Sequence, residues 1–108
     1  MTRKLVQPAG HWDPRPRFAQ VVQSGKQIYI AGQTSVDEQG NVVGKGDIEV
    51  QTRQVFQNLR KCLESVGAGF HHVVKLNIYS TDLDAHREII RKLRGEVFRE
   101  PVASTTIQ

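Results

Sequence analysis

The part of the sequence that most constrains the fold is the continuous stretch of residues 28–84. A strand pattern, a glycine-rich turn, a long amphipathic helix and a second strand pattern follow one another there. The helix is the best defined of these elements, because its apolar residues recur at the spacing that places side chains on one helix face. They are Ile48, Val55, Phe56, Leu59, Cys62, Leu63 and Val66.

Both ends of this helix carry local signals. Asp47 is suited to be the N-cap, because its carboxylate can accept hydrogen bonds from the free amides of the first turn. Gly67 and Gly69 predict a left-handed end, since glycine adopts positive φ without steric cost. The sequence therefore predicts a helix that begins after Asp47 and ends before Gly67.

Strands and a second helix are predicted on either side. Residues 18–22 and 27–31 read as strands, and the turn at 24–26 joins them into an antiparallel hairpin. Residues 42–43 could add a short strand, and 73–79 and 103–108 read as further strands. The second helix is expected to begin near Asp84 and to bury the following side chains: Ile89, Ile90, Leu93, Val97 and Phe98.

Residues before Arg17 are expected to form an irregular arm. Pro8, Gly10, Pro14 and Pro16 disfavour both a regular helix and a central strand. The remaining order, β-β-α-β-α-β, predicts an α+β fold in which two helices pack on one face of a mixed sheet.

The opposite sheet face would be open in a monomer. The strand at residues 27–31 has apolar side chains pointing both ways, which predicts that this face is covered by other subunits. No internal repeat or linker divides residues 1–108, so we expect a single domain.

Composition and charge limit the expected cellular location and partners of the protein. No apolar run approaches the roughly 18 residues of a membrane-spanning helix, and the N-terminal residues lack the apolar core of a signal peptide. We therefore expect no membrane partner. The single cysteine excludes an internal disulfide, so a reducing compartment, the cytoplasm, is expected. The net charge of +4 is scattered beside acidic residues, which argues against a nucleic-acid partner.

Three short motifs carry a resemblance to a known family. They are Gly32-Gln33 after the second strand, the Gln-Thr-Arg-Gln sequence at 51–54 followed by Asn58-Leu59, and Thr81-Asp82-Leu83. With their order of elements, they resemble the RidA/YjgF family, also described as endoribonuclease L-PSP-type. The resemblance implies a chorismate-mutase-like fold, a homotrimer with ligand clefts between subunits, and hydrolysis of reactive imines and enamines. It also implies that the family's C-terminal hairpin would lie beyond Gln108.

The family's deaminases carry an arginine on the strand that corresponds to residues 103–108, where it clamps the substrate carboxylate. Matching the strand pattern places that arginine on Ser104, whereas anchoring on Pro101 places it on Ala103. Neither residue is basic, so the resemblance points to a subgroup that lacks the deaminase arginine. Arg15, Arg17 or Arg99 are candidates to supply the charge from elsewhere.

The resemblance implies the other positions of the cleft. Thr106 falls where deaminases have a cysteine, Gly32 matches a glycine whose backbone lines the cleft, and Ile90 replaces a polar residue. Phe18 falls on a position that is tyrosine in many members. The candidate ligand-binding residues are Phe18, Gly32, Ile90, Ser104, Thr105 and Thr106. No catalytic residue is assigned, because the glutamate that helps to activate water in deaminases would lie beyond Gln108.

Cysteine and histidine give no further site. Cys62 falls in the apolar helix stripe and is expected to be a buried, inert thiol. His71 and His72 are adjacent and would point to opposite faces of a strand, and His11 and His86 lack ligand-spaced partners. We therefore expect no metal and no cofactor.

The leading interpretation is a small-molecule-binding protein of this family that hydrolyses imine- or enamine-type metabolites in a cleft without the arginine. Three alternatives stay open. The protein could be a genuine deaminase of 2-iminobutanoate or 2-aminoacrylate with an altered carboxylate anchor, an endoribonuclease or RNA-binding protein, or a non-catalytic regulatory trimer.

Overall fold

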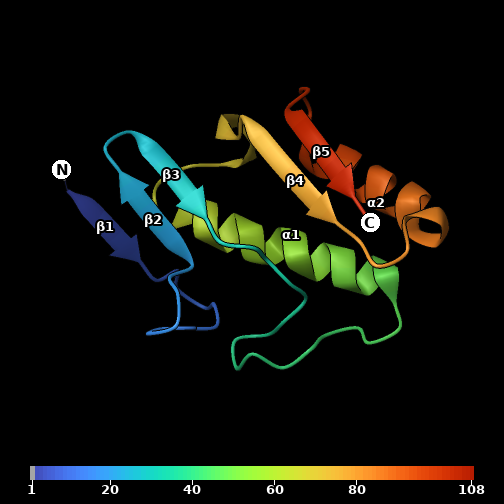
Figure 1. Ribbon diagram of the computed structural model, residues 1–108, viewed down its shortest axis with the longest axis horizontal. Coiled ribbons are helices and arrows are strands. Elements are labelled where there is room, and N and C mark those ends of the chain that lie inside the picture. The colour runs from blue at the N-terminus through green and yellow to red at the C-terminus, as the bar shows by residue number, and fades with distance from the viewer. Residues whose placement is uncertain (1) are drawn as a thin grey trace.

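The computed structural model of the protein describes residues 2–108. Three strands come first, followed by a long helix, a short 3-10 helix, a fourth strand, a second helix and a fifth strand (Figure 1). Their bounds are β1 Arg3–Val6, β2 Val21–Ser24, β3 Gln27–Ile30, α1 Ile48–Glu64, the 3-10 helix Phe70–His72, β4 Lys75–Tyr79, α2 Leu83–Val97 and β5 Ala103–Ile107. The α+β class and the two helices agree with the prediction.

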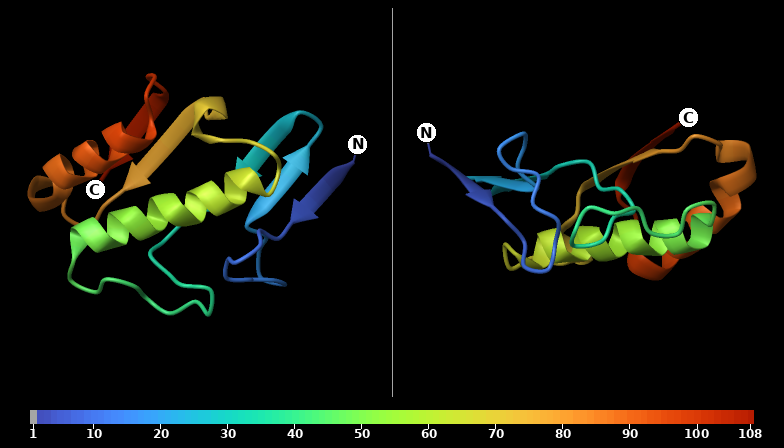
Figure 2. Two further views of the ribbon diagram at one scale, coloured as in Figure 1. Left: turned by 180° about the vertical axis from the view of Figure 1, so that it is seen from behind. Right: turned by 90° about the horizontal axis from the view of Figure 1, so that it is seen from below.

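The strands form two sheets where one mixed sheet was expected. β1, β2 and β3 make an antiparallel sheet in that order, and β4 and β5 make a parallel pair. The two helices lie on the same side of the strands (Figure 2). The buried apolar residues that form the core are Val21, Phe56, Cys62, Leu63, Leu83 and Leu93.

β1 corrects the prediction of an irregular arm. Lys4 pairs with Gln23 and Leu5 with Val22, which extends the hairpin by one antiparallel strand. The prolines that disfavour regular structure begin only at Pro8, so the residues before them are free to join a sheet edge. The element order is therefore β-β-β-α-β-α-β.

The helix ends follow the local signals with one change. The Asp47 carboxylate accepts a hydrogen bond from the Val50 amide at 3.1 Å, as predicted. Gly67 has a φ of 73°, in the left-handed region, but Gly69 is extended and its predicted left-handed role is wrong. α2 begins at Leu83, as predicted for a start near Asp84, and Asp82 caps it by accepting from the amide of Ala85.

Several strand limits also shift. A turn in which the Arg17 amide donates to the Pro14 carbonyl delays β2 to Val21, so Phe18 lies outside the strand. Residues 42–43 form only an isolated bridge, between Val36 and Val42. The hairpin turn at Gly25 is as predicted, with Ser24 paired to Gln27.

The sheets have one face against the helices and one face toward solvent. Val21 is fully buried. Leu5 and Tyr29 are in register with Val22, and neighbouring side chains of a strand point to opposite faces, so they fall on the other side of the sheet from Val21. We call this side the open face. Its exposed large apolar residues are Leu5, Tyr29, Tyr79 and Ile107, which are 47–73 % exposed. No helix within residues 2–108 is both long enough and apolar enough to cross a bilayer.

Candidate functional site

Strand β5 divides the predicted cleft residues between its two faces. On the helix side, the Arg94 guanidinium donates to the Ser104 hydroxyl at 2.9 Å, and Thr106 lines a cavity together with α2. Neighbouring residues of a strand point to opposite faces, so Thr105 lies on the open face. The three residues therefore do not line one surface.

Lys75 stands beside Thr105 on the open face. It is in register with Ala103 on the neighbouring strand, and its ammonium group donates to the Thr105 hydroxyl at 2.8 Å. Both side chains are exposed. A cation therefore occupies the open face next to Ala103, one of the two positions considered for the family's arginine.

A small cavity lies behind β5, between α2 and the β4–β5 pair. Its volume is about 110 Å³, and Ile90 and Thr106 are among the residues that line it. Three arginines of α2 line it as well: Arg87, Arg91 and Arg94. The helix side of β5 is thus the more positive of the two sides.

Phe18 and Gly32 lie with the other sheet and do not line this cavity. The Phe18 ring is 44 % exposed and meets the Trp12 ring edge-on, with centroids 6.2 Å apart. Gly32 follows β3, and a Cβ at this position would meet nothing within 4 Å. The six candidate residues therefore do not form one cleft within a single chain.

The loop after Gly32 is held by Asn58 of α1. Its side-chain amide donates to the carbonyls of Thr34 and Val36, at 3.1 and 2.9 Å, and its carbonyl accepts from Gln54. Asn58 is only 2 % exposed, so these bonds replace those that water would make. The sequence motif around residue 58 thus has a structural role in fixing the Gly32 loop.

A second polar network fixes the N-terminal arm to the ends of β2 and β3. The Gln33 amide nitrogen donates to the Ala31 carbonyl and to Gln20, so its oxygen must be the atom that faces His11, at 2.6 Å from the ring Nε2. His11 is 8 % exposed, and this contact requires it to carry a proton on Nε2. This role of His11 was not predictable from local patterns, because His11 and Gln33 are 22 residues apart.

The family model described as Endoribonuclease L-PSP matches residues 10–108. The chain belongs to the RidA/YjgF family. A RutC family protein of Pyrococcus abyssi is 35 % identical over 83 residues, which cover 77 % of this chain and 61 % of that protein. A RutC family protein of Synechocystis is 31 % identical over 104 residues, covering 95 % of this chain and 79 % of the relative.

Solved structures agree with the RidA/YjgF assignment. A crystal structure of a Thermotoga maritima protein is 26 % identical, with a TM-score of 0.89, and the match covers 99 % of this chain and 84 % of that one. A Giardia lamblia protein is 28 % identical with a TM-score of 0.87, at 99 % and 86 % coverage. The chain spans 61 % and 58 % of the lengths of the two Pyrococcus RutC family relatives, from P. abyssi and P. horikoshii.

Two of the arginines considered as substitutes for the RidA/YjgF arginine are engaged elsewhere. Arg15 forms an ion pair with Asp13, and the hydrogen bonds of its guanidinium lower the pKa of that carboxyl to about 2. The Arg17 guanidinium lies over the Trp12 ring, 5.9 Å from its centroid. Lys75 was missed, because its proximity to Ala103 depends on the pairing of two strands 28 residues apart.

The α2 arginines were missed too, although they left a signal. Arg87, Arg91 and Arg94 are spaced by four and three residues, the spacing that gathers side chains on one helix face. The charged residues are scattered along the sequence, but these three arginines fall on one side of the helix.

Cys62 is fully buried, as predicted, and burial raises the pKa of its thiol to about 11. His71 and His72 lie in the 3-10 helix with ring centroids 3.9 Å apart. They precede the strand, which begins at Lys75 rather than at residue 73 as predicted. Within residues 2–108, no three His, Cys, Asp or Glu residues are grouped to hold a metal ion.

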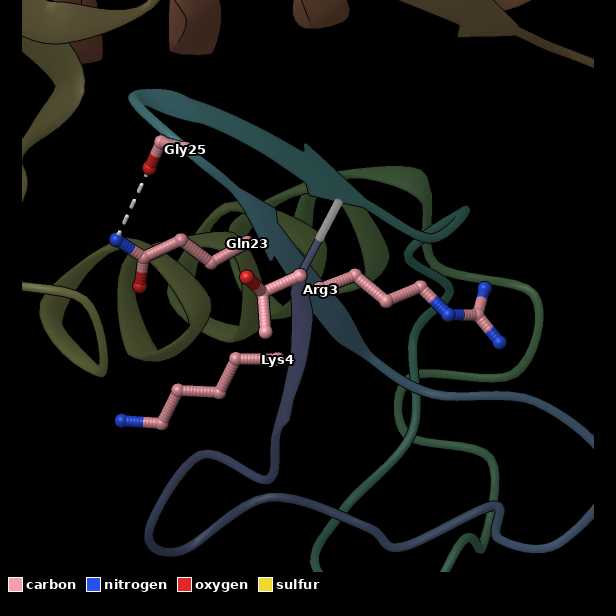
Figure 3. A pocket seen from close by; sticks show the side chains of 5 residues that line it. Arg3, Lys4, Gln23 and Gly25 are labelled. Atoms are coloured by element: carbon pink, nitrogen blue, oxygen red, sulfur yellow. Dashed lines mark hydrogen bonds between the residues drawn. The ribbon is translucent and has the colours of Figure 1, made fainter.

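A wider depression of about 510 Å³ lies at the edge strand β1. Figure 3 shows that the Arg3 and Lys4 side chains extend away from each other, while Gln23 donates to the Gly25 carbonyl at 3.5 Å. These polar groups do not converge on a common point, so the depression is not a built ligand site.

Proposed function

We propose that this RidA/YjgF-family chain is a cytoplasmic small-molecule-binding protein that hydrolyses imine- or enamine-type metabolites in clefts between the subunits of a homotrimer. The observation that carries the proposal is the contact between the Lys75 ammonium and the Thr105 hydroxyl on the open face. It offers an anionic substrate a cation and a hydroxyl group side by side.

Lys75 would take over the charge, though not the geometry, of the arginine that the sequence lacks. An ammonium group is a compact charge with three rotatable donors, whereas a guanidinium grips a carboxylate through two parallel hydrogen bonds. A carboxylate bound by Lys75 is therefore attracted without being oriented as firmly. This predicts measurable turnover with a high KM.

Imine hydrolysis mainly requires the protein to position the substrate and a water molecule. Water adds to the imine carbon, the nitrogen takes up a proton and leaves as ammonia, and a 2-oxo acid remains. Holding the carboxylate next to a positioned water supplies the proximity that the reaction needs. We assign Lys75 the binding of the carboxylate and Thr105 the orientation of Lys75 or of the water.

The location between subunits is supported by the separation of the candidate residues. Phe18 and Gly32 belong to the β1–β2–β3 half, and Thr105 belongs to the β4–β5 half. The open face carries four large apolar side chains that water would otherwise solvate, and such faces mark association surfaces. A second copy on this face would bring Phe18 and Gly32 of one subunit toward Thr105 of the next.

The test is hydrolysis of 2-iminobutanoate, generated in situ, by the purified protein and two matched variants. Lys75→Gln should lower kcat/KM on the order of tenfold, mainly through KM, because one charge-assisted bond is lost. Lys26→Gln removes the same charge from the exposed hairpin turn and should leave kcat/KM unchanged. Equal activity in both variants would remove Lys75 from the proposal. The absence of turnover above the spontaneous rate in the wild type would favour a non-catalytic regulatory trimer.

A further inference from the structure

Three arginines of α2 form a cluster on the helix side of β5. Arg87, Arg91 and Arg94 line the cavity of about 110 Å³, together with Thr106. The remaining lining residues are apolar: Ile78, Leu83 and Ile90. The cavity thus has cationic groups, a hydroxyl group and an apolar wall.

None of the ion pairs within residues 2–108 involves this cluster, because they join Arg15 to Asp13 and Arg53 to Glu96. Asp84 and Glu88 precede Arg87 and Arg91 by three residues on the same helix, a spacing at which opposite charges attract. Their carboxylates nevertheless form no ion pair with the arginines, so the guanidinium groups keep donors for an anion in the cavity.

Arg94 is already aimed at the strand. Its side chain is half-buried, and its guanidinium donates to the Ser104 hydroxyl at 2.9 Å. The Ser104 hydroxyl accepts that bond and keeps its own proton to donate. The Thr106 hydroxyl, two residues further on the same face, can donate as well.

We propose that this cluster binds the terminal phosphate of a small phosphate monoester. A phosphate monoester carries nearly two negative charges at neutral pH, which match three guanidinium groups better than the single charge of a carboxylate. Guanidinium groups bind phosphate through paired hydrogen bonds. The cavity has room for a few water-sized groups, and its apolar wall suits the first carbon atoms of the ester.

The small cavity and its three guanidinium groups favour a monoester over the backbone of RNA. Each internal phosphate of RNA carries one charge and is esterified on both sides. A terminal phosphate can enter a small cavity, whereas an internal diester would need room for a chain on each side. RNA is therefore an outcome that the test must separate from the proposal.

This site is complete within one chain and lies on the opposite side of β5 from Lys75 and Thr105. It needs neither the assembly nor the turnover that the proposed function requires. Failure of the one proposal would leave the other standing, because phosphate binding and imine hydrolysis are measured separately.

The experiment is a calorimetric and NMR titration of the purified protein with four probes: inorganic phosphate, propyl phosphate, dimethyl phosphate and a short oligoribonucleotide. We expect saturable binding of propyl phosphate with one site per chain, and of inorganic phosphate more weakly, because it lacks the carbon chain. Dimethyl phosphate, a singly charged diester, should not saturate. The backbone amides that shift should belong to α2 and β5.

Two charge-matched variants on the same helix complete the test. Arg91→Gln should weaken propyl phosphate binding on the order of tenfold to a hundredfold, the loss expected for one charge-assisted bond. Lys92→Gln, next in sequence and also exposed, should bind like the wild type. Circular dichroism checks that both variants are folded.

Three results would overturn the proposal. They are the absence of saturable binding by both propyl phosphate and inorganic phosphate, equal affinities in the Arg91→Gln and Lys92→Gln variants, or binding of the oligoribonucleotide in preference to propyl phosphate. The last result would identify the cluster as an RNA-binding surface.

Discussion

The two faces of β5 differ in what they meet, although the residues that form them alternate along five consecutive positions. On the open face, Thr105 meets a single flexible ammonium group, that of Lys75, and solvent. On the helix face, Ser104 and Thr106 meet α2 with its three arginines and an apolar wall. One strand can therefore serve two chemically different surfaces, because a one-residue step reverses the direction of the side chain.

The two sides of the β4–β5 pair also differ in burial. The helix that covers one face, α2, holds the buried residues Leu83 and Leu93, whereas Tyr79 and Ile107 on the open face are 73 % and 47 % exposed. Substitutions on the helix face should therefore change the free energy of unfolding, and those on the open face should change what the protein contacts.

The largest expected effect on stability is that of Leu93→Ala. Leu93 is 2 % exposed, and truncating a buried leucine costs about 2–5 kcal/mol of unfolding free energy through lost burial and the cavity left behind. Tyr79→Thr, at an open-face position that is 73 % exposed, should change it by no more than about 0.5 kcal/mol. Urea unfolding of both variants checks this, and similar midpoints would contradict the division between the faces.

The next effect concerns the reactivity of Cys62. Its thiol pKa of about 11, against an ordinary value of 9.0, leaves about a hundredfold less thiolate at pH 8, because a raised pKa favours the protonated form. Alkylation by iodoacetamide should be slower than that of glutathione by at least this factor, and should reach the rate of a free thiol in urea. Fast alkylation of the folded protein would show that the apolar stripe of α1 is open to solvent.

A smaller effect is expected at Asn58, which ties the Gly32 loop to α1. Asn58→Ala leaves the carbonyls of Thr34 and Val36 without their buried donor, which costs about 1–3 kcal/mol. Gln57→Ala, on the exposed side of the same helix, is the matched control. Hydrogen exchange at residues 32–36 should rise in Asn58→Ala only, and an unchanged loop would mean that α1 does not position Gly32.

The parts of the fold that the sequence predicted depend on local signals. The stripe from Ile48 to Val66 predicted α1, and the Asp47 carboxylate predicted its start, because a helix face and a cap involve residues within a few positions of each other. The strand at Arg3–Val6 was missed because its partner, β2, lies about 18 residues away and nothing in its four residues marks an edge strand.

The site was predicted less well for the same physical reason. The alternation of Ser104, Thr105 and Thr106 was readable in the sequence, but which side faces α2 is set by tertiary packing. The contact between Lys75 and Thr105 depends on the register of the β4–β5 pair. Only the spacing of the α2 arginines could have been recognised beforehand.

The most direct test of the account places an arginine on each face of β5 in turn. Ala103→Arg points a guanidinium to the open face beside Lys75, whereas Ser104→Arg points one into the existing cluster of arginines. The measurement is kcat/KM for 2-iminobutanoate hydrolysis. The account predicts a gain on the order of tenfold for Ala103→Arg and none for Ser104→Arg. A gain in Ser104→Arg without one in Ala103→Arg would show that the substrate binds on the helix side, and would contradict the assignment of the two faces.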